Sequence, residues 1–181
     1  MANKENNLNP FHIEFIQKQK VFFVATAPTE GFINLSPKGM DSFRVIDNQT
    51  IVWLNLTGSG NETAAHLLEN PRMTIMMTAF EGDPLILRLY GKAVAFHPRD
   101  QEWEDYIHLF PEMPGSRQII ELKLEKVMTS CGFAVPIMEF KKERSQLIDW
   151  SNKKGEEGIL EYQKNKNVLS LNGKPTGLFE V

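Results

Sequence analysis

Apolar residues along most of the chain occur in short runs that are rich in β-branched and aromatic side chains. A turn signal such as "PTEG", "PKGMD" or "EGDP" closes several of these runs. This pattern predicts strands joined by tight turns. The strands are expected over residues 21–27, 32–36, 43–47, 50–56, 72–80, 85–96 and 116–133. The third and fourth runs, and likewise the fifth and sixth, are close enough in sequence to form antiparallel pairs.

Helical patterns lie at the margins of these runs. The pair Asn9-Pro10 is typical of an N-cap followed by proline at the first helical position, and it begins the first predicted helix. The third predicted helix places Trp103, Ile107 and Phe110 on one side. The four helices are expected over residues 10–20, 61–69, 98–110 and from about 141, with an extended tail after the last, "NVLSLNGKPTGLFEV".

The order of these elements is mostly strand after strand, with helices before and after. Such an order is typical of an antiparallel β-barrel with peripheral helices, and a parallel α/β sheet is excluded. We therefore expect a mainly β (α+β) fold in one domain, residues 1–181. Its barrel core would occupy about 21–140 and a helical C-terminal tail about 141–181.

Charge and composition narrow the classes of partner. The 181 residues carry a net charge of −3 without a basic stripe, which argues against nucleic-acid binding. No apolar run is long enough to cross a membrane, and the polar start "MANKENNLNP" lacks the apolar core of a signal peptide. A single cysteine, Cys131, excludes an internal disulfide. These features predict a cytoplasmic protein.

The stretch "LTGSGNETAAHLLENP" resembles a phosphate-binding loop, because Gly58-Ser59-Gly60 follows a predicted strand and precedes a predicted helix. The dinucleotide fingerprint needs a third glycine and a βαβ unit, and both are missing. The Walker A loop and the nucleophile elbow also fail at their required positions. Two interpretations remain. Ser59, Asn61 and Thr63 could surround an anion at the helix N-terminus, or Ser59 or Asn61 could simply cap the helix, which is the commoner use.

Other chemically active residues give weaker signals. The four histidines lack metal-ligand spacing, so no metal site is expected. His66 could face solvent or the flavin phosphate, and solvent is expected. Cys131 could be a reactive thiol, but packing among apolar neighbours is expected.

The motifs "NLSPKGMDSFRV", "GSGNETAAHL", "ENPRMTIMM" and "LRLYGKAVAF" occur together in this chain. In combination they resemble the pyridoxamine 5'-phosphate oxidase superfamily of FMN-binding split β-barrels, over residues 21–144. The resemblance implies a split barrel that forms a homodimer, with FMN seated between the two chains. It also implies flavin contacts from one strand, at Lys38, Phe43, Arg44 and Val45, and from another at Arg88. An outward-facing Arg88 is the alternative.

Two motifs of the family are altered here. The Ser-Arg-Lys cluster that holds the flavin phosphate corresponds to Asn61-Glu62-Thr63 in this chain. The phosphate would then depend on Lys38, Arg44, Ser59, Asn61, Thr63 and the helix N-terminus. The Arg-x-His pair that grips the substrate corresponds to Gln146 and Ile148, so oxidation of pyridoxamine phosphate is not expected.

These observations predict an FMN-dependent oxidoreductase that acts on an unidentified small molecule. The isoalloxazine would perform the hydride chemistry, and the sequence identifies no acid–base residue. The alternative is a non-catalytic protein of the same fold that binds a flavin, haem or deazaflavin. A third possibility is a dimer with an empty pocket and a structural role.

Overall fold

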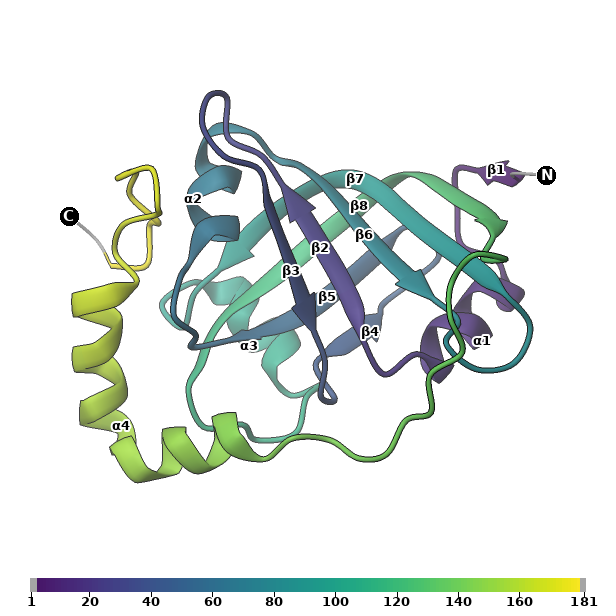
Figure 1. The fold of residues 1–181 in the computed structure, drawn as a ribbon. Helices are drawn as coiled ribbons and strands as arrows, with labels where there is room; N and C mark the ends of the chain where they lie inside the picture. The colour runs from purple at the N-terminus through teal and green to yellow at the C-terminus, as the bar shows by residue number, and fades with distance from the viewer. Residues whose placement is uncertain (1–2, 180–181) are drawn as a thin grey trace.

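The structure, a computed structural model, describes residues 3–179 and consists of one strongly curled sheet with helices around it (Figure 1). The last two residues of the predicted tail lie outside the described range. The strands are β1 (Asn3–Glu5), β2 (Phe22–Thr26), β3 (Asn34–Lys38), β4 (Phe43–Val45), β5 (Thr50–Leu56), β6 (Arg72–Thr78), β7 (Leu85–Phe96) and β8 (Ser116–Cys131). The helices are α1 (Pro10–Lys18), α2 (Glu62–Glu69), α3 (Gln101–Ile107) and α4 (Gln146–Lys166).

The strands pair in the order β3-β2-β6-β7-β8-β5-β4, and β1 adds to β8. Every pair is antiparallel, and the predicted hairpins β4–β5 and β6–β7 are confirmed. Because β3 and β4 are the two ends of this order, the curled sheet stays open between them. The fold is therefore an antiparallel split barrel, as predicted.

The surroundings of strand β5 explain why its residues 51–54 are apolar without interruption. Trp53 is completely buried in the main core inside the barrel, where its ring lies 6.1 Å from that of Phe22. The alternate residues Val52 and Leu54 pack on the other face of the strand, in a second cluster beneath α3 with Trp103. A strand that is covered on both faces carries apolar residues at successive positions.

Helix boundaries follow from caps. At α1, Asn9 Oδ1 accepts a hydrogen bond from the backbone N–H of His12 at 3.0 Å, which confirms the predicted cap. Helix α3 begins at Gln101, three residues later than the expected Pro98. The reason is that Asp100 Oδ2 accepts from the His97 backbone N–H at 2.7 Å and holds the intervening residues in a turn.

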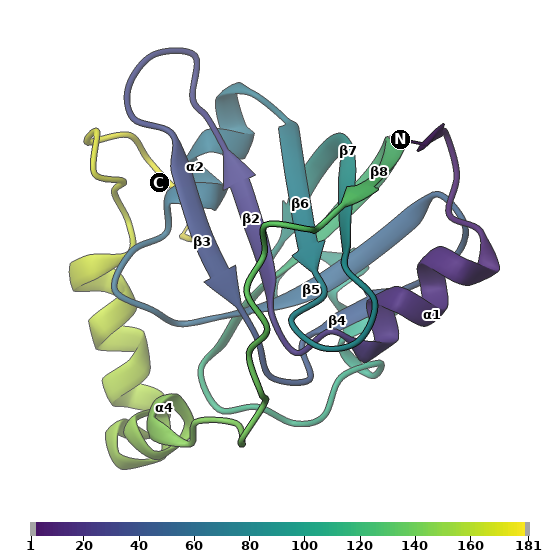
Figure 2. The same cartoon turned by 45° about the vertical axis from the view of Figure 1, so that its right-hand side comes forward.

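The C-terminal region differs most from expectation. Residues 132–145 form neither helix nor strand, and α4 is interrupted at Gly155, where φ is 67°. The segment after α4 is not extended, because Leu169 and Pro175 bridge across a turn. Figures 1 and 2 show this segment and α4 on the side of the barrel opposite α1, with the segment beside α2.

Candidate functional site

Buried and half-buried polar side chains gather at one end of the barrel interior, between the ends of β3 and β5 and the start of β8. Lys38 Nζ donates to Asn55 Oδ1 at 3.2 Å, and Asn55 Nδ2 donates to Gln118 Oε1 at 3.1 Å. Gln118 Nε2 lies 3.1 Å from His97 Nε2. We call these residues, together with Arg117 of the same strand as Gln118, the polar cluster: Lys38, Asn55, His97, Arg117 and Gln118.

The direction of these hydrogen bonds assigns the histidine tautomer. Since Gln118 Nε2 can only donate, His97 Nε2 must accept, and the ring proton lies on Nδ1. That nitrogen faces Asp100 Oδ2 at 3.4 Å. Burial, together with the nearby Arg99 charge, lowers the pKa of His97, which favours this neutral form. The result is a continuous chain of hydrogen bonds from the Lys38 ammonium to the Asp100 carboxylate, in which each side chain donates to the next.

A β-bulge turns Arg117 into the cluster. In the pairing of β5 with β8, Asn55 lies opposite Gln118 but Leu56 lies opposite Ser116, so Arg117 is the extra residue. Its side chain is only 3% exposed. Nη1 donates to Asn167 Oδ1 at 2.7 Å and to Gly60 O at 3.1 Å. Nε is buried and has no hydrogen-bond partner between residues 3 and 179.

Two desolvated cations therefore lie close together. Burial lowers the pKa of Lys38 to about 8, and repulsion from Arg117 adds to this effect. Burial also lowers the pKa of Arg117 to about 10. Within the described chain neither side chain forms an ion pair with a carboxylate. Buried charges without a counter-charge are costly, so the cluster has the chemistry of an anion-binding site.

The glycine loop, Gly58-Ser59-Gly60, is held beside this cluster by the end of α4 and by the C-terminal segment that follows it, residues 167–179. Asn167 is fully buried, and its Nδ2 donates to Gly58 O at 3.0 Å. Gln163 Nε2 donates to Thr57 Oγ1 at 2.8 Å, and Lys174 Nζ bonds the Glu69 carboxylate at 2.7 Å. The loop is therefore positioned by side chains that are more than a hundred residues away in the sequence.

The same segment changes the role of Asn61. This residue occupies the N-cap position of α2, but its side chain makes no capping hydrogen bond. Its Nδ2 instead faces Asn167 O at 3.4 Å. The interpretation that the Asn61 side chain simply caps the helix is therefore wrong, because the C-terminal segment competes for the side chain.

The structure brings only some of the predicted flavin contacts together. Lys38 belongs to the polar cluster, Asn61 and Thr63 are buried at the adjoining start of α2, and Ser59 is exposed on the loop. Phe43 and Val45 pack against the main core.

Arg44 and Arg88 lie elsewhere. Arg44 Nε donates to Leu109 O at 2.8 Å and its Nη atoms grip Asp41 at 2.6 and 3.0 Å. Arg88 is on the outer face of the sheet, where Nη1 donates to Ser130 Oγ at 3.0 Å. This outward orientation is the alternative that was considered for it.

Sequence reasoning missed Arg117, Asn55, Gln118 and His97. One signal was available: "SRQ" places three successive polar residues at the start of β8, before Ile119 and Ile120, so the strand does not alternate there. Such a break is typical of a bulge.

Two expectations about single residues are wrong. His66 is 1% exposed, and its Nδ1 lies 3.0 Å from Thr26 Oγ1, because α2 presents this face to β2. Cys131 ends β8 and is exposed. Among residues 3–179 no group of three His, Cys, Asp or Glu side chains could hold a metal ion. No helix in this part of the chain is long and apolar enough to span a membrane.

Known proteins provide the context for this site. The family model for pyridoxamine 5'-phosphate oxidase matches residues 8–131, more than half of the chain. The chain belongs to the pyridoxamine 5'-phosphate oxidase family. It is 33% identical over 178 residues to the pyridoxamine 5'-phosphate oxidase family protein ustO of Aspergillus flavus, covering 87% of this chain and 71% of that protein.

Two solved structures share the fold of this pyridoxamine 5'-phosphate oxidase family member. HupZ from Group A Streptococcus superposes with a TM-score of 0.54 at 20% identity, over 66% of this chain and 91% of HupZ. A candidate pyridoxamine 5'-phosphate oxidase from Lactobacillus delbrueckii gives a TM-score of 0.54 at 18% identity, over 68% of this chain and 94% of that protein. At these identities the likeness concerns the fold alone.

Proposed function

We propose that this protein is a homodimeric FMN-binding flavoprotein and an FMN-dependent oxidoreductase on a small molecule. The supporting observation is the pair of cations beside the glycine loop, the half-buried Lys38 and the buried Arg117, which have no carboxylate partner in the described chain. A phosphate group would supply the missing negative charge. Arg117 would also supply positive charge to the phosphate. In the family this charge comes from an Arg and a Lys, whose positions are occupied here by Glu62 and Thr63.

The residues of the chain have distinct tasks in this proposal. Asn167 and Gly60 O orient the Arg117 guanidinium, and Asn55 orients the Lys38 ammonium. The start of α2 adds backbone N–H groups. When bound, FMN supplies hydride-transfer chemistry that no side chain provides. The polar Gln146 and apolar Ile148, in the first turn of α4, offer no cation to a second phosphate, so the substrate differs from pyridoxamine phosphate.

Dimerisation is supported by an apolar strip on the hairpin between β2 and β3. Phe32, Ile33 and Leu35 are 69%, 76% and 66% exposed. Neighbouring apolar side chains that remain in water commonly mark a protein interface. Light scattering should give twice the mass of one chain. Ile33→Lys combined with Leu35→Lys should give a monomer, and a monomeric wild-type protein would overturn the dimer.

The first test of the flavin site is the visible spectrum of the purified protein, before and after addition of FMN and removal of the unbound fraction. Wild-type protein should retain a two-band flavin spectrum. Arg117→Met and Lys38→Met should each weaken FMN binding at least tenfold, because charge-assisted contacts to a phosphate contribute about 1.5–3 kcal/mol each. Arg88→Met, which removes a cation on the outer face, is the matched control and should retain FMN.

The outcomes separate the alternatives. Wild-type protein that retains no FMN would reject the flavoprotein, and a sharp haem band would favour the non-catalytic haem carrier. If FMN binds, oxidation of reduced nicotinamide in the presence of an acceptor distinguishes an oxidoreductase from a flavin carrier.

A further inference from the structure

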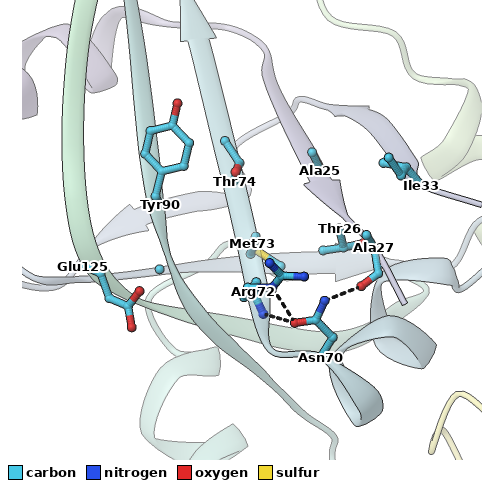
Figure 3. Close-up of a pocket in the computed structure, with 11 residues that line it drawn as sticks. Ala25, Thr26, Ala27, Ile33, Asn70, Arg72, Met73, Thr74, Tyr90 and Glu125 are labelled. Carbon is cyan, nitrogen blue, oxygen red and sulfur yellow. Dashed lines mark hydrogen bonds between the residues drawn. The ribbon is translucent and has the colours of Figure 1, made fainter. Parts of the chain in front are cut away.

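A separate pocket of 390 Å³ opens on the outer face of the sheet, between the end of β2, the start of β6 and the middle of β7 (Figure 3). Its walls combine apolar groups with a few polar ones, which is the usual character of a small-molecule pocket. Ala25 and Ile33 provide apolar surface, Ile33 from the strip proposed above as the dimer contact, whereas Arg72 and Glu125 provide opposite charges. None of these four residues belongs to the polar cluster.

A second bulge in β8 brings Glu125 to this pocket. Tyr90 pairs with Lys126 but Gly91 pairs with Leu124, so Glu125 is the extra residue. The backbones approach so closely that a Cβ on Gly91 would lie 1.9 Å from Lys123 O. Only glycine permits this approach, and the bulge beside it determines the position from which Glu125 extends.

Arg72 is held in place by its neighbours. Asn70 Oδ1 accepts from Arg72 Nε at 3.0 Å, while Asn70 Nδ2 donates to Ala27 O at 2.9 Å (Figure 3). Asn70 therefore ties the guanidinium to the end of β2. Neither Nη1 nor Nη2 of Arg72 has a hydrogen-bond partner among residues 3–179, so both remain available to a ligand.

The two charges line one pocket without neutralising each other. Arg72 and Glu125 form no ion pair within 4.0 Å, and the carboxylate contacts only the exposed Lys92, at 3.7 Å, among the ion pairs of the described residues. A ligand with one negative and one positive group would complement both. The Tyr90 ring and the apolar wall would receive its remaining part.

We infer that this outer-face pocket binds a small zwitterion of the amino-acid type with an apolar side chain. The ligand carboxylate pairs with the free Nη atoms of Arg72, and the ammonium pairs with Glu125. Bidentate pairing of a carboxylate with an arginine is among the strongest charge-assisted contacts. This site is independent of the polar cluster and goes beyond the proposed flavin chemistry.

Isothermal titration calorimetry with three matched probes tests the inference on the whole protein, in whichever oligomeric state light scattering finds. L-Phenylalanine carries both charges, 3-phenylpropanoate only the negative one and 2-phenylethylamine only the positive one. L-Phenylalanine should bind at least about fivefold more tightly than either analogue, since each analogue lacks one charge-assisted contact, which contributes about 1 kcal/mol at a partly exposed site.

Variants separate the two charges. Arg72→Met should weaken L-phenylalanine at least tenfold, and Glu125→Gln should weaken it while leaving 3-phenylpropanoate unchanged. Lys92→Met, which removes a cation that does not line the pocket, should change each affinity less than twofold. No binding of any probe would overturn the inference, and so would equal binding of all three or an effect of Lys92→Met as large as that of Arg72→Met. Retention of FMN by Arg72→Met separates this result from failure of the proposed function.

Discussion

Strand β8 contains two bulges, and they have opposite consequences. The bulge at Arg117 turns a cation into the interior, where Asn167 and the Gly60 carbonyl hold it. The bulge at Glu125 leaves an anion at the rim of a pocket on the outer face. The same backbone device thus presents a charge at two sites in one strand.

The difference lies in what enforces each bulge. The second arises from a close approach of backbones at Gly91, which is a steric requirement of the sheet itself. The first is supported by side chains and by the C-terminal segment, because Arg117 is buried among Asn167, Gly60 and Lys38. We therefore expect the Glu125 bulge to be essential for folding and the Arg117 bulge to be essential for ligand binding.

The largest expected effect is that of Gly91→Ala. The added Cβ would meet Lys123 O at 1.9 Å, so the backbones of β7 and β8 would have to separate. We expect a loss of about 3 kcal/mol or more in the free energy of unfolding, measured with urea. Gly58→Ala is the control, because nothing lies within 4 Å of its added Cβ. Equal stability of the two variants would show that the bulge is not sterically enforced.

Asn167→Asp tests the Arg117 bulge by supplying the missing counter-charge. The new carboxylate would lie against Arg117 Nη1, where Asn167 Oδ1 now accepts at 2.7 Å, and would compete with a bound phosphate. FMN affinity, measured by fluorescence titration, should fall at least about tenfold. Asn165→Asp makes the same charge change at an exposed position of α4 and should have little effect. Unchanged FMN affinity in Asn167→Asp would exclude Arg117 from the phosphate site.

The pH dependence of the free energy of unfolding tests whether the Lys38 ammonium is desolvated in the folded protein. Lys38 has a pKa of about 8 in the folded protein, against 10.5 for the free side chain. Between these values the unfolded chain binds more protons, so the stability of ligand-free protein should rise with pH. Relative to Lys38→Met, the wild type should gain about 2 kcal/mol between pH 8 and 10 in urea unfolding. Parallel pH profiles would mean that Lys38 is not desolvated.

The smallest effect is expected for Glu125→Gln. Its exposed ion pair with Lys92 spans 3.7 Å, and such pairs contribute little to stability. The free energy of unfolding should change by less than about 0.5 kcal/mol, even though amino-acid binding weakens. A larger loss would indicate that the Glu125 charge, and not Gly91, maintains the second bulge.

Much of the fold could be predicted because its signals are local. Asn9-Pro10 begins α1, and the "EGDP" turn joins β6 to β7, since caps and turns depend on neighbouring residues. Strand β1 was not predicted, because a segment of three residues acquires its structure only by pairing with β8. For the same reason His66 was expected in solvent, although packing of α2 on β2 buries it.

The sequence by itself determined the split barrel, the family and one member of the polar cluster, Lys38. Only the tertiary structure showed that Arg117, and not Arg44, lies beside it, and that Asn167 orients that arginine. The physical reason is that alternation assigns strand side chains to faces only while the register is unbroken. A bulge shifts the register, and its position depends on contacts between strands and with the distant C-terminal segment.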